Sequence, residues 1–410
     1  MSASRWATLS FFIYFFFVFF GTSMPFQGDI TDPRDISTSN PVNQFLFSFL
    51  YFVSFASLIS KKDQVIRILK NEKLLSAFLF WSFLSVFWSE VPLVSFKRWV
   101  QVAGTCIICL SALVHWNSAD EAMSYFKAIL LIYIPLTFLS ILFVPGAIQW
   151  EFPAWRGFAS HKNMLGQVSL LSLFVWTYFI CKQGSRKRVV AVLFWILSFV
   201  LFIGARSATA IITAGCLLLL VGSLYTERVV IRQVVGGFFS SVLFFSFYIS
   251  LFLVLYFQRE AIGWLFEVFG KDTTLSGRAD LWACLFEESR KHLLLGCGFE
   301  GFWTINNPVM DNVFEEFVWL PTHAHMGYLD ILNETGIVGI SVFSLMLAFY
   351  FKNLFKLGKP HIWKWFIIAA LMLNITESTL FRLNEATGVL FTFSYLALYA
   401  QLDKKEVSFT

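Results

Sequence analysis

The chain has 410 residues, of which 57% are hydrophobic and only 14% charged, and its mean hydropathy is +0.69. Because a soluble domain carries about 25% charged residues, this composition argues against a soluble protein and predicts an all-α polytopic membrane protein. The net charge of +5 does not indicate nucleic-acid binding, since excess Lys and Arg in a membrane protein usually marks cytoplasmic loops.

The apolar runs predict about twelve transmembrane helices, because a spanning helix needs about 20 largely apolar residues. In chain order they lie at 7–24, 43–60, 74–89, 98–115, 123–145, 163–181, 189–205, 207–225, 233–257, 327–351, 362–377 and 386–402. The first run resembles a signal-peptide core in length, but no convincing cleavage site follows, so we interpret it as a retained span. We expect one transmembrane domain over residues 1–410.

Charge predicts the orientation of these spans. Basic residues concentrate in alternate connections, at 61–67, 184–188, 226–232 and 352–364, and in the tail from Lys404. By the positive-inside rule both termini are cytoplasmic, and the one long loop, residues 258–326, lies on the outer side.

That loop contains a stretch, 276–295, with apolar residues at the spacing of one helix face, which predicts an amphipathic helix at the membrane surface. Cys284 and Cys297 also fall in the loop and could form a disulfide there. Cys106 and Cys109 form a CxxC inside an apolar run, where packing is the simpler interpretation.

Two arginines of the outer side are candidate anion ligands. Arg206 stands between two apolar runs, where an arginine is costly unless it reaches the interface or finds a partner. Arg278 stands at the start of the amphipathic helix, whose N-terminus favours an anion. Arginine suits bidentate phosphate contacts, but an interfacial Arg206 and an exposed surface Arg278 are the plain alternatives.

Further cations stand on the same side. Arg156, His161 and Lys162 precede the sixth predicted span, and Arg98, after Lys97, begins the fourth. Basic residues on this side run against the positive-inside bias. We therefore treat them as candidate phosphate-binding residues.

Two of the six histidines, His323 and His325, stand directly before the tenth span. A neutral imidazole with a pKa near 6.5 is a ready general base. A zinc site is the rival, but two histidines without a Cys or acidic motif support it poorly, and an interfacial role is the plain alternative. Asp330 and Glu334 follow, either to orient an imidazole or as ordinary acidic residues of a helix start.

Three motifs resemble the O-antigen ligase and polymerase superfamily, which includes exopolysaccharide polymerization proteins. They are RGFASHKNMLG from Arg156, SGRADLW with the later LGCGFEGF, and HAHMGYLDILNETGIVG from His323. Met326 departs from the pattern, because an Asn is common at that position.

The resemblance implies a metal-independent, inverting glycosyltransferase without a cofactor in the bacterial inner membrane, with its active site at the periplasmic face. Its donor would be a glycan on undecaprenyl pyrophosphate. By position, His325 would be the base, with His323 as the second candidate because the spacing allows the two to be confused. Arg206 and Arg278 would bind the departing pyrophosphate. Arg156, His161, Lys162, His323 and Arg98 would assist in substrate binding.

Two acceptors fit the resemblance. A polymerase moves the growing glycan to the next lipid-linked repeat unit, which the motif forms favour, whereas an O-antigen ligase moves finished glycan to lipid A-core. Besides membrane lipids, a chain-length regulator and a flippase are further candidate partners. A transporter or flippase, for which Lys127 is the main charge inside a span, and a structural assembly partner are the alternatives from other classes.

Overall fold

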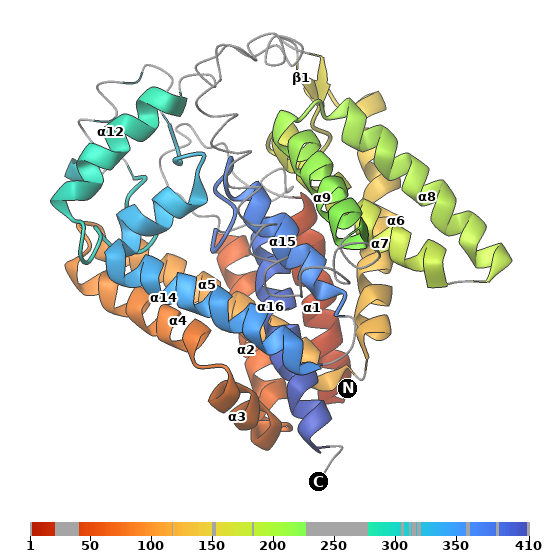
Figure 1. Ribbon diagram of the computed structural model, residues 1–410, viewed down its shortest axis with the longest axis horizontal. Helices are drawn as coiled ribbons and strands as arrows, with labels where there is room; N and C mark the ends of the chain where they lie inside the picture. The colour runs from red at the N-terminus through yellow and green to blue at the C-terminus, as the bar shows by residue number, and fades with distance from the viewer. Residues whose placement is uncertain are drawn as a thin grey trace.

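The structure is a computed structural model. It describes residues 2–20, 41–116, 118–149, 153–182, 184–226, 278–304, 307–310, 313, 317, 321–357, 361–382 and 385–407. Within these residues nearly all regular structure is helical, which confirms the all-α fold expected from the composition (Figure 1). Two-residue strands, β1 (Ile148–Gln149) and β2 (Ala154–Trp155), pair antiparallel within one connection.

The helices before the long loop are α1 (Ala3–Phe20), α2 (Pro41–Ile59), α3 (Lys62–Asn71), α4 (Leu74–Leu84), the 3₁₀ turn η1 (Ser85–Trp88), α5 (Pro92–His115), α6 (Ala119–Phe143), α7 (Lys162–Lys182), α8 (Ser185–Gly204) and α9 (Ala208–Thr226). Those that follow are α12 (Arg278–Lys291), the 3₁₀ turn η3 (Pro308–Met310), α14 (Gly327–Leu357), α15 (Trp363–Leu373) and α16 (Ala386–Val407).

Seven of the described helices are long and apolar enough to cross a membrane, so the chain is a polytopic membrane protein: α1, α2, α5, α6, α7, α8 and α14. The shorter apolar helices α4 with η1, α9 and α15, together with α16, coincide with further expected spans. The expected span at 233–257 and the first part of the expected loop, 258–277, lie outside the described residues. The count of twelve spans therefore stays a prediction.

Helix α16 lies at the centre of the bundle and is buried along nearly its whole length (Figure 1). Phe393 of this helix packs with aromatic rings of three other helices: Phe11, Trp363 and Phe126. Helix α8, in contrast, exposes apolar side chains such as Leu193 and Ile196. Such a face fits contact with lipid, where apolar exposure carries no cost.

The start of α1 and the end of α16 lie at the same end of the bundle, and α12 and β1 lie at the opposite end (Figure 1). We call the end with α12 the outer end. This arrangement agrees with the expectation that both termini face one side and the long loop the other. Which compartment each side faces stays a prediction.

A break in α14 joins this helix to the loop. Gly336 has φ 67° and ψ −171°, so the helical bonding stops there. The freed N–H groups of Ile337 and Val338 donate to the carbonyls of Leu293 and Leu294.

On the other side of the break, the carbonyls of Asn333 and Glu334 accept from the N–H groups of Cys297 and Gly298. The segment after α12 thus satisfies the backbone groups that the break leaves open, as an apolar environment demands.

Helix α12 differs in part from the amphipathic helix expected at 276–295. It ends at Lys291, and its apolar residues Leu281 and Leu285 are fully buried in a small core beneath the loop, so they do not face the membrane. Cys297 belongs to the same core as a free thiol, and the structure holds no disulfide between it and Cys284. Cys106 and Cys109 are buried in the main core, which confirms their packing role.

Candidate active site

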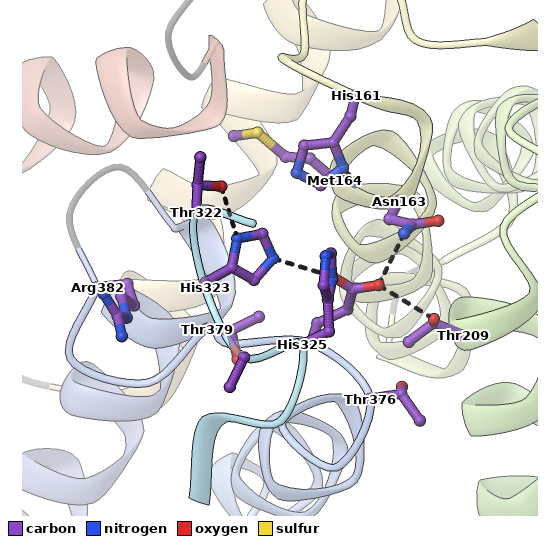
Figure 2. Close-up of polar contacts among 12 residues, drawn as sticks. His161, Asn163, Met164, Thr209, Thr322, His323, His325, Thr376, Thr379 and Arg382 are labelled. Atoms are coloured by element: carbon purple, nitrogen blue, oxygen red, sulfur yellow. Dashed lines mark hydrogen bonds and ion pairs between the residues drawn. The ribbon is translucent and has the colours of Figure 1, made fainter. Parts of the chain in front are cut away.

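Polar side chains from several connections meet at one place toward the outer end of the bundle. Figure 2 shows His161 and Asn163 from the start of α7, Thr209 from the start of α9, and His323 and His325 from the segment before α14. Residues far apart in the chain are thus brought together. We take this cluster as the candidate active site.

The carboxylate of Glu377 is the common partner of both histidines. One of its oxygens, Oε2, lies 3.4 Å from Nδ1 of His325 and 3.8 Å from Nε2 of His323. The rings of the two histidines are 4.0 Å apart between centroids. Although only His325 lies within hydrogen-bond distance, both imidazoles face the same negative charge.

The second oxygen of Glu377, Oε1, is held by three other residues. Nη2 of Arg278 lies 3.2 Å away. Nδ2 of Asn163 donates at 2.7 Å and the Thr209 hydroxyl donates at 3.4 Å, as the dashed lines from these two residues in Figure 2 show. The side chain of Glu377 is only 3% exposed. A buried carboxylate needs such partners, because an unpaired buried charge is very costly.

Asn374 shapes the turn that carries Glu377. It caps the C-terminus of α15, and its Oδ1 accepts hydrogen bonds from the backbone N–H groups of Thr379 and Leu380 at 3.1 Å each. Gly327 packs against it so closely that a Cβ there would lie 2.0 Å from Oδ1. The start of α14 and the turn with Glu377 are therefore in direct contact.

The charge state of Glu377 follows from these contacts. Burial by itself would raise the pKa of the carboxyl group, but its contacts to His323 and His325 and the charge of Arg278 outweigh burial and hold that pKa well below its usual value. Glu377 is therefore a carboxylate at neutral pH.

His325 is held as a neutral imidazole. Burial lowers its pKa to about 4, and His323 and Arg278 lower it too, while Glu377 acts in the opposite direction. Because the carboxylate of Glu377 accepts, Nδ1 of His325 carries the proton and donates it, which leaves Nε2 as the basic nitrogen. Its backbone has φ 53°, an uncommon conformation for a residue other than glycine.

The contacts of His323 favour the opposite tautomer from that of His325. The Thr322 hydroxyl lies 3.1 Å from its Nδ1 (Figure 2). If that hydroxyl donates, Nε2 of His323 carries the proton and points it toward Glu377. The two imidazoles then present opposite tautomers to one carboxylate, which distinguishes their roles.

The predicted anion ligands behave differently. Arg278 is fixed, since Nη1 donates to the carbonyl of Thr376 at 2.6 Å while Nη2 contacts Glu377. Arg206 is exposed and its backbone has φ 45°. Lys162 lies nearby, and its pKa is lowered by burial and by the positive charge of Arg206. The residue after it, Ser207, donates to Oδ1 of Asn163 at 3.1 Å, so Arg206 borders the site.

Two other candidates support the chain around the site. Nδ1 of His161 accepts a hydrogen bond from the N–H of Met164 at 3.3 Å. Burial lowers the pKa of His161; the charge of Glu377 raises that pKa, and those of His323 and Arg278 lower it. Arg156 donates to the carbonyls of Gly146 and Ser160, at 2.5 and 3.2 Å. It therefore braces its own connection, and a phosphate contact stays a prediction.

Arg98 lies beside a second ionic cluster, and its electrostatic neighbours are Glu300, Arg382 and Glu334. In this cluster Arg382 contacts Glu300 at 3.1 Å, Asp330 at 3.1 Å and Glu334 at 2.7 Å. The carboxylates hold the pKa of Arg382 above its usual value despite burial.

Asp330 and Glu334 are therefore not the carboxylates that pair with the imidazoles, and neither is an exposed acidic residue of a helix start. Both are buried partners of Arg382. Glu377 is the carboxylate beside the imidazoles, and the motif spacing did not reveal it because it is 52 residues from His325 in the chain. An acidic residue closing the expected span 362–377 was its only signal, since such a charge is costly unless functional.

Glu377, His323 and His325 also meet a geometric requirement for metal binding, because one ligand atom from each lies within 4.8 Å of the others. Two histidines and a glutamate are a donor set that zinc uses. Arg278, 3.2 Å from the same carboxylate, opposes a second cation there. We therefore favour proton transfer as the task of these groups.

Residues 191–344 match the family model described as O-antigen ligase. This range contains Arg206, Arg278, His323 and His325, whereas Glu377 lies beyond it. The chain is also similar to the exopolysaccharide production protein ExoQ of Rhizobium meliloti (strain 1021), with 25% identity over 289 residues. That match covers 66% of this chain and 62% of the relative, which is less than two thirds of its length. The predicted resemblance to the O-antigen ligase and polymerase superfamily is confirmed.

Proposed function

We propose that this protein is an inverting glycosyltransferase that polymerizes undecaprenyl-pyrophosphate-linked repeat units at the periplasmic face of the bacterial inner membrane. The observation that carries the proposal is the contact of Glu377 with both Arg278 and His325. Helix α12, which begins at Arg278, lies at the outer end of a membrane-spanning bundle (Figure 1). Such a site meets a substrate whose lipid lies in the membrane and whose glycan lies in water.

The chemistry uses the two arginines for the leaving group. The acceptor hydroxyl oxygen forms a bond to the anomeric carbon while the bond from that carbon to the phosphate oxygen breaks. The pyrophosphate leaves with the electron pair, and Arg278 and Arg206 stabilise its charge by charge-assisted hydrogen bonds. Attack opposite the leaving group inverts the anomeric configuration.

His325 takes the proton of the acceptor hydroxyl at Nε2. Glu377 fixes the tautomer through Nδ1 and stabilises the imidazolium that forms. The positive charge of Arg278 contributes to the low pKa of His325. A bound pyrophosphate offsets that charge, so the imidazole becomes a stronger base when the donor is present.

Polymerization is favoured over ligation by the similarity to a protein described by its role in exopolysaccharide production. O-antigen ligation to lipid A-core is the alternative, because the matching family model is described by that activity. A transporter or flippase is a further alternative. Lys127 is the charged residue that a transporter would use. Its Nζ lies 4.6 Å from the centroid of the Phe179 ring, which is a cation–π contact within the bundle.

The test is turnover of an undecaprenyl-pyrophosphate-linked repeat unit by purified protein in EDTA. We expect glycan ladders from the wild type and none from His325→Ala. His292→Ala, which removes an exposed histidine of the same loop, should behave as the wild type.

The other outcomes assign the alternatives. No ladder, but transfer to added lipid A-core, would establish a ligase, and neither product would favour the transporter. Activity that EDTA abolishes and zinc restores would make the two histidines and Glu377 metal ligands. A fully active His325→Ala would move the role of base to His323.

A further inference from the structure

The residue between the two histidines, Ala324, is fully buried and held on both sides by side chains. Its N–H, in the peptide that follows His323, donates to the carboxylate of Asp330 at 3.3 and 3.4 Å. Its carbonyl, in the peptide that precedes His325, accepts from the indole N–H of Trp282 at 2.8 Å. Each histidine therefore has its own anchored peptide.

Both anchors belong to larger structural units. Asp330 is buried, accepts from the indole N–H of Trp303 at 2.6 Å and contacts Arg382 at 3.1 Å. Trp282 lies on α12, one turn after Arg278. Residues four apart share a helix face, so one face of α12 contacts Glu377 through Arg278 and the histidine segment through Trp282.

The anchors also hold an unfavourable backbone. His325 has φ 53°, and a residue other than glycine in this region persists only where its surroundings enforce it. In this conformation Nδ1 of His325 lies 3.4 Å from Oε2 of Glu377.

We propose that Trp282 and Asp330 are positioning residues, which hold the Ala324 peptides so that His323 and His325 face Glu377. The inference rests on the proposed function. Helix α12 would then have two roles: Arg278 binds the leaving group, and Trp282 aligns the histidine that acts as the base.

The first test is Trp282→Phe, which keeps an aromatic ring and removes the N–H donor. A small displacement of a catalytic group costs up to about 100-fold in rate, so we expect kcat to fall about 10-fold with little change in KM for the lipid-linked donor. Asp330→Asn, which removes the charge but keeps an acceptor for Ala324, should act on kcat in the same direction.

The matched control is Trp99→Phe, because the indole N–H of Trp99 also donates to a backbone carbonyl, that of Leu79 at 2.7 Å, away from the histidines. It should leave kcat unchanged, while the two Phe variants lose thermal stability to a similar degree. An equal fall of kcat in both Trp→Phe variants, or a fall of kcat in neither, would overturn the proposal.

A measurement without turnover separates this inference from the proposed function. We would follow modification of single histidines by diethyl pyrocarbonate with mass spectrometry. Trp282→Phe should change the rate at His323 and His325 relative to exposed His292, and Trp99→Phe should not. Unchanged rates in Trp282→Phe would overturn the positioning role, whereas a wild type without glycan transfer would overturn only the proposed function.

Discussion

At the scale of single residues, the site depends on one carboxylate that several groups share. Glu377 accepts from Asn163 and Thr209, pairs with Arg278 and faces two imidazoles, while being almost fully buried. Removing its charge disturbs the base and the leaving-group ligand together. A neutral substitute should therefore cost more than the loss of a single hydrogen bond.

The first prediction concerns Glu377→Gln. We expect kcat to fall about 100-fold or more, because the orientation of His325 and the stabilisation of its imidazolium are lost. Glycan-ladder formation by purified protein measures this.

Its control is Glu385→Gln in the same connection. Burial raises the pKa of Glu385 to about 8, so this residue is mostly protonated at pH 7 and the neutral amide resembles it. Activity should stay within about twofold of the wild type. Equal losses in both variants would contradict a specific role for Glu377.

The second prediction concerns pH. The active form of His325 is the neutral imidazole, and burial lowers its pKa to about 4. The acid limb of kcat/KM should therefore fall with decreasing pH near 4. At pH 5.5 activity should be nearly full, whereas a histidine with a pKa of about 6.5 would be only about one tenth neutral. A limb centred near 6.5 would show that the free enzyme does not hold His325 in this way.

At the scale of elements, two glycines let the loop bond to the broken helix α14. A Cβ on Gly336 would lie 2.2 Å from the carbonyl oxygen of Leu294, and a Cβ on Gly296 would lie 2.4 Å from the backbone of Glu334. Both have positive φ, at 67° and 72°. The LGCG and NETG stretches therefore approach each other so closely that a side chain at either glycine would meet the opposite backbone.

The third prediction is that Gly336→Ala destabilises the protein. The backbone conformation alone costs about 1–3 kcal/mol for a residue with a side chain, and the contact with Leu294 adds to it. We expect a lower melting temperature in detergent and a lower yield in membranes. Gly215→Ala in α9, where a Cβ meets nothing within 4 Å, should be neutral or slightly stabilising. Equal melting temperatures for the wild type and Gly336→Ala would argue against the interlock.

At the scale of the whole molecule, the bundle places its chemistry at one end. Helix α12, which begins at Arg278, lies at one end, and the start of α1 and the end of α16 lie at the other (Figure 1). Glu377 contacts both Arg278 and His325, so these groups lie toward the end with α12. Cys181, near the end of α7, is an exposed thiol beside the basic connection at 184–188. The positive-inside rule assigns that connection to the cytoplasm.

The fourth prediction tests this orientation. A membrane-impermeant thiol reagent should label Cys181 only after the cells are permeabilised. A cysteine introduced at Glu287, an exposed position of α12, should react in intact spheroplasts. Cys181→Ser provides the background from the other thiols. Labelling of Cys181 in intact spheroplasts would reverse the predicted orientation.

Local sequence was sufficient for the helices and for part of the site. An apolar run of spanning length predicts a helix wherever it occurs, so α2 and α7 were predicted to within two residues of their bounds, whereas α5 begins six residues earlier than expected. His325 and Arg278 were predicted because they stand in motifs with recognisable neighbours, and both contact Glu377 in the structure. Glu377 and the pairing of Asp330 with Arg382 were not, because their partners are about 50 residues away or more.

The sequence by itself therefore determined that the protein resides in a membrane and which side chains are available for chemistry. Both follow from short segments, because hydropathy and motifs are local properties. Only the tertiary structure decided which carboxylate meets the imidazoles and which meets Arg382. That choice depends on how α12, α14 and the turn after α15 pack at the outer end, where a buried charge is costly without a partner.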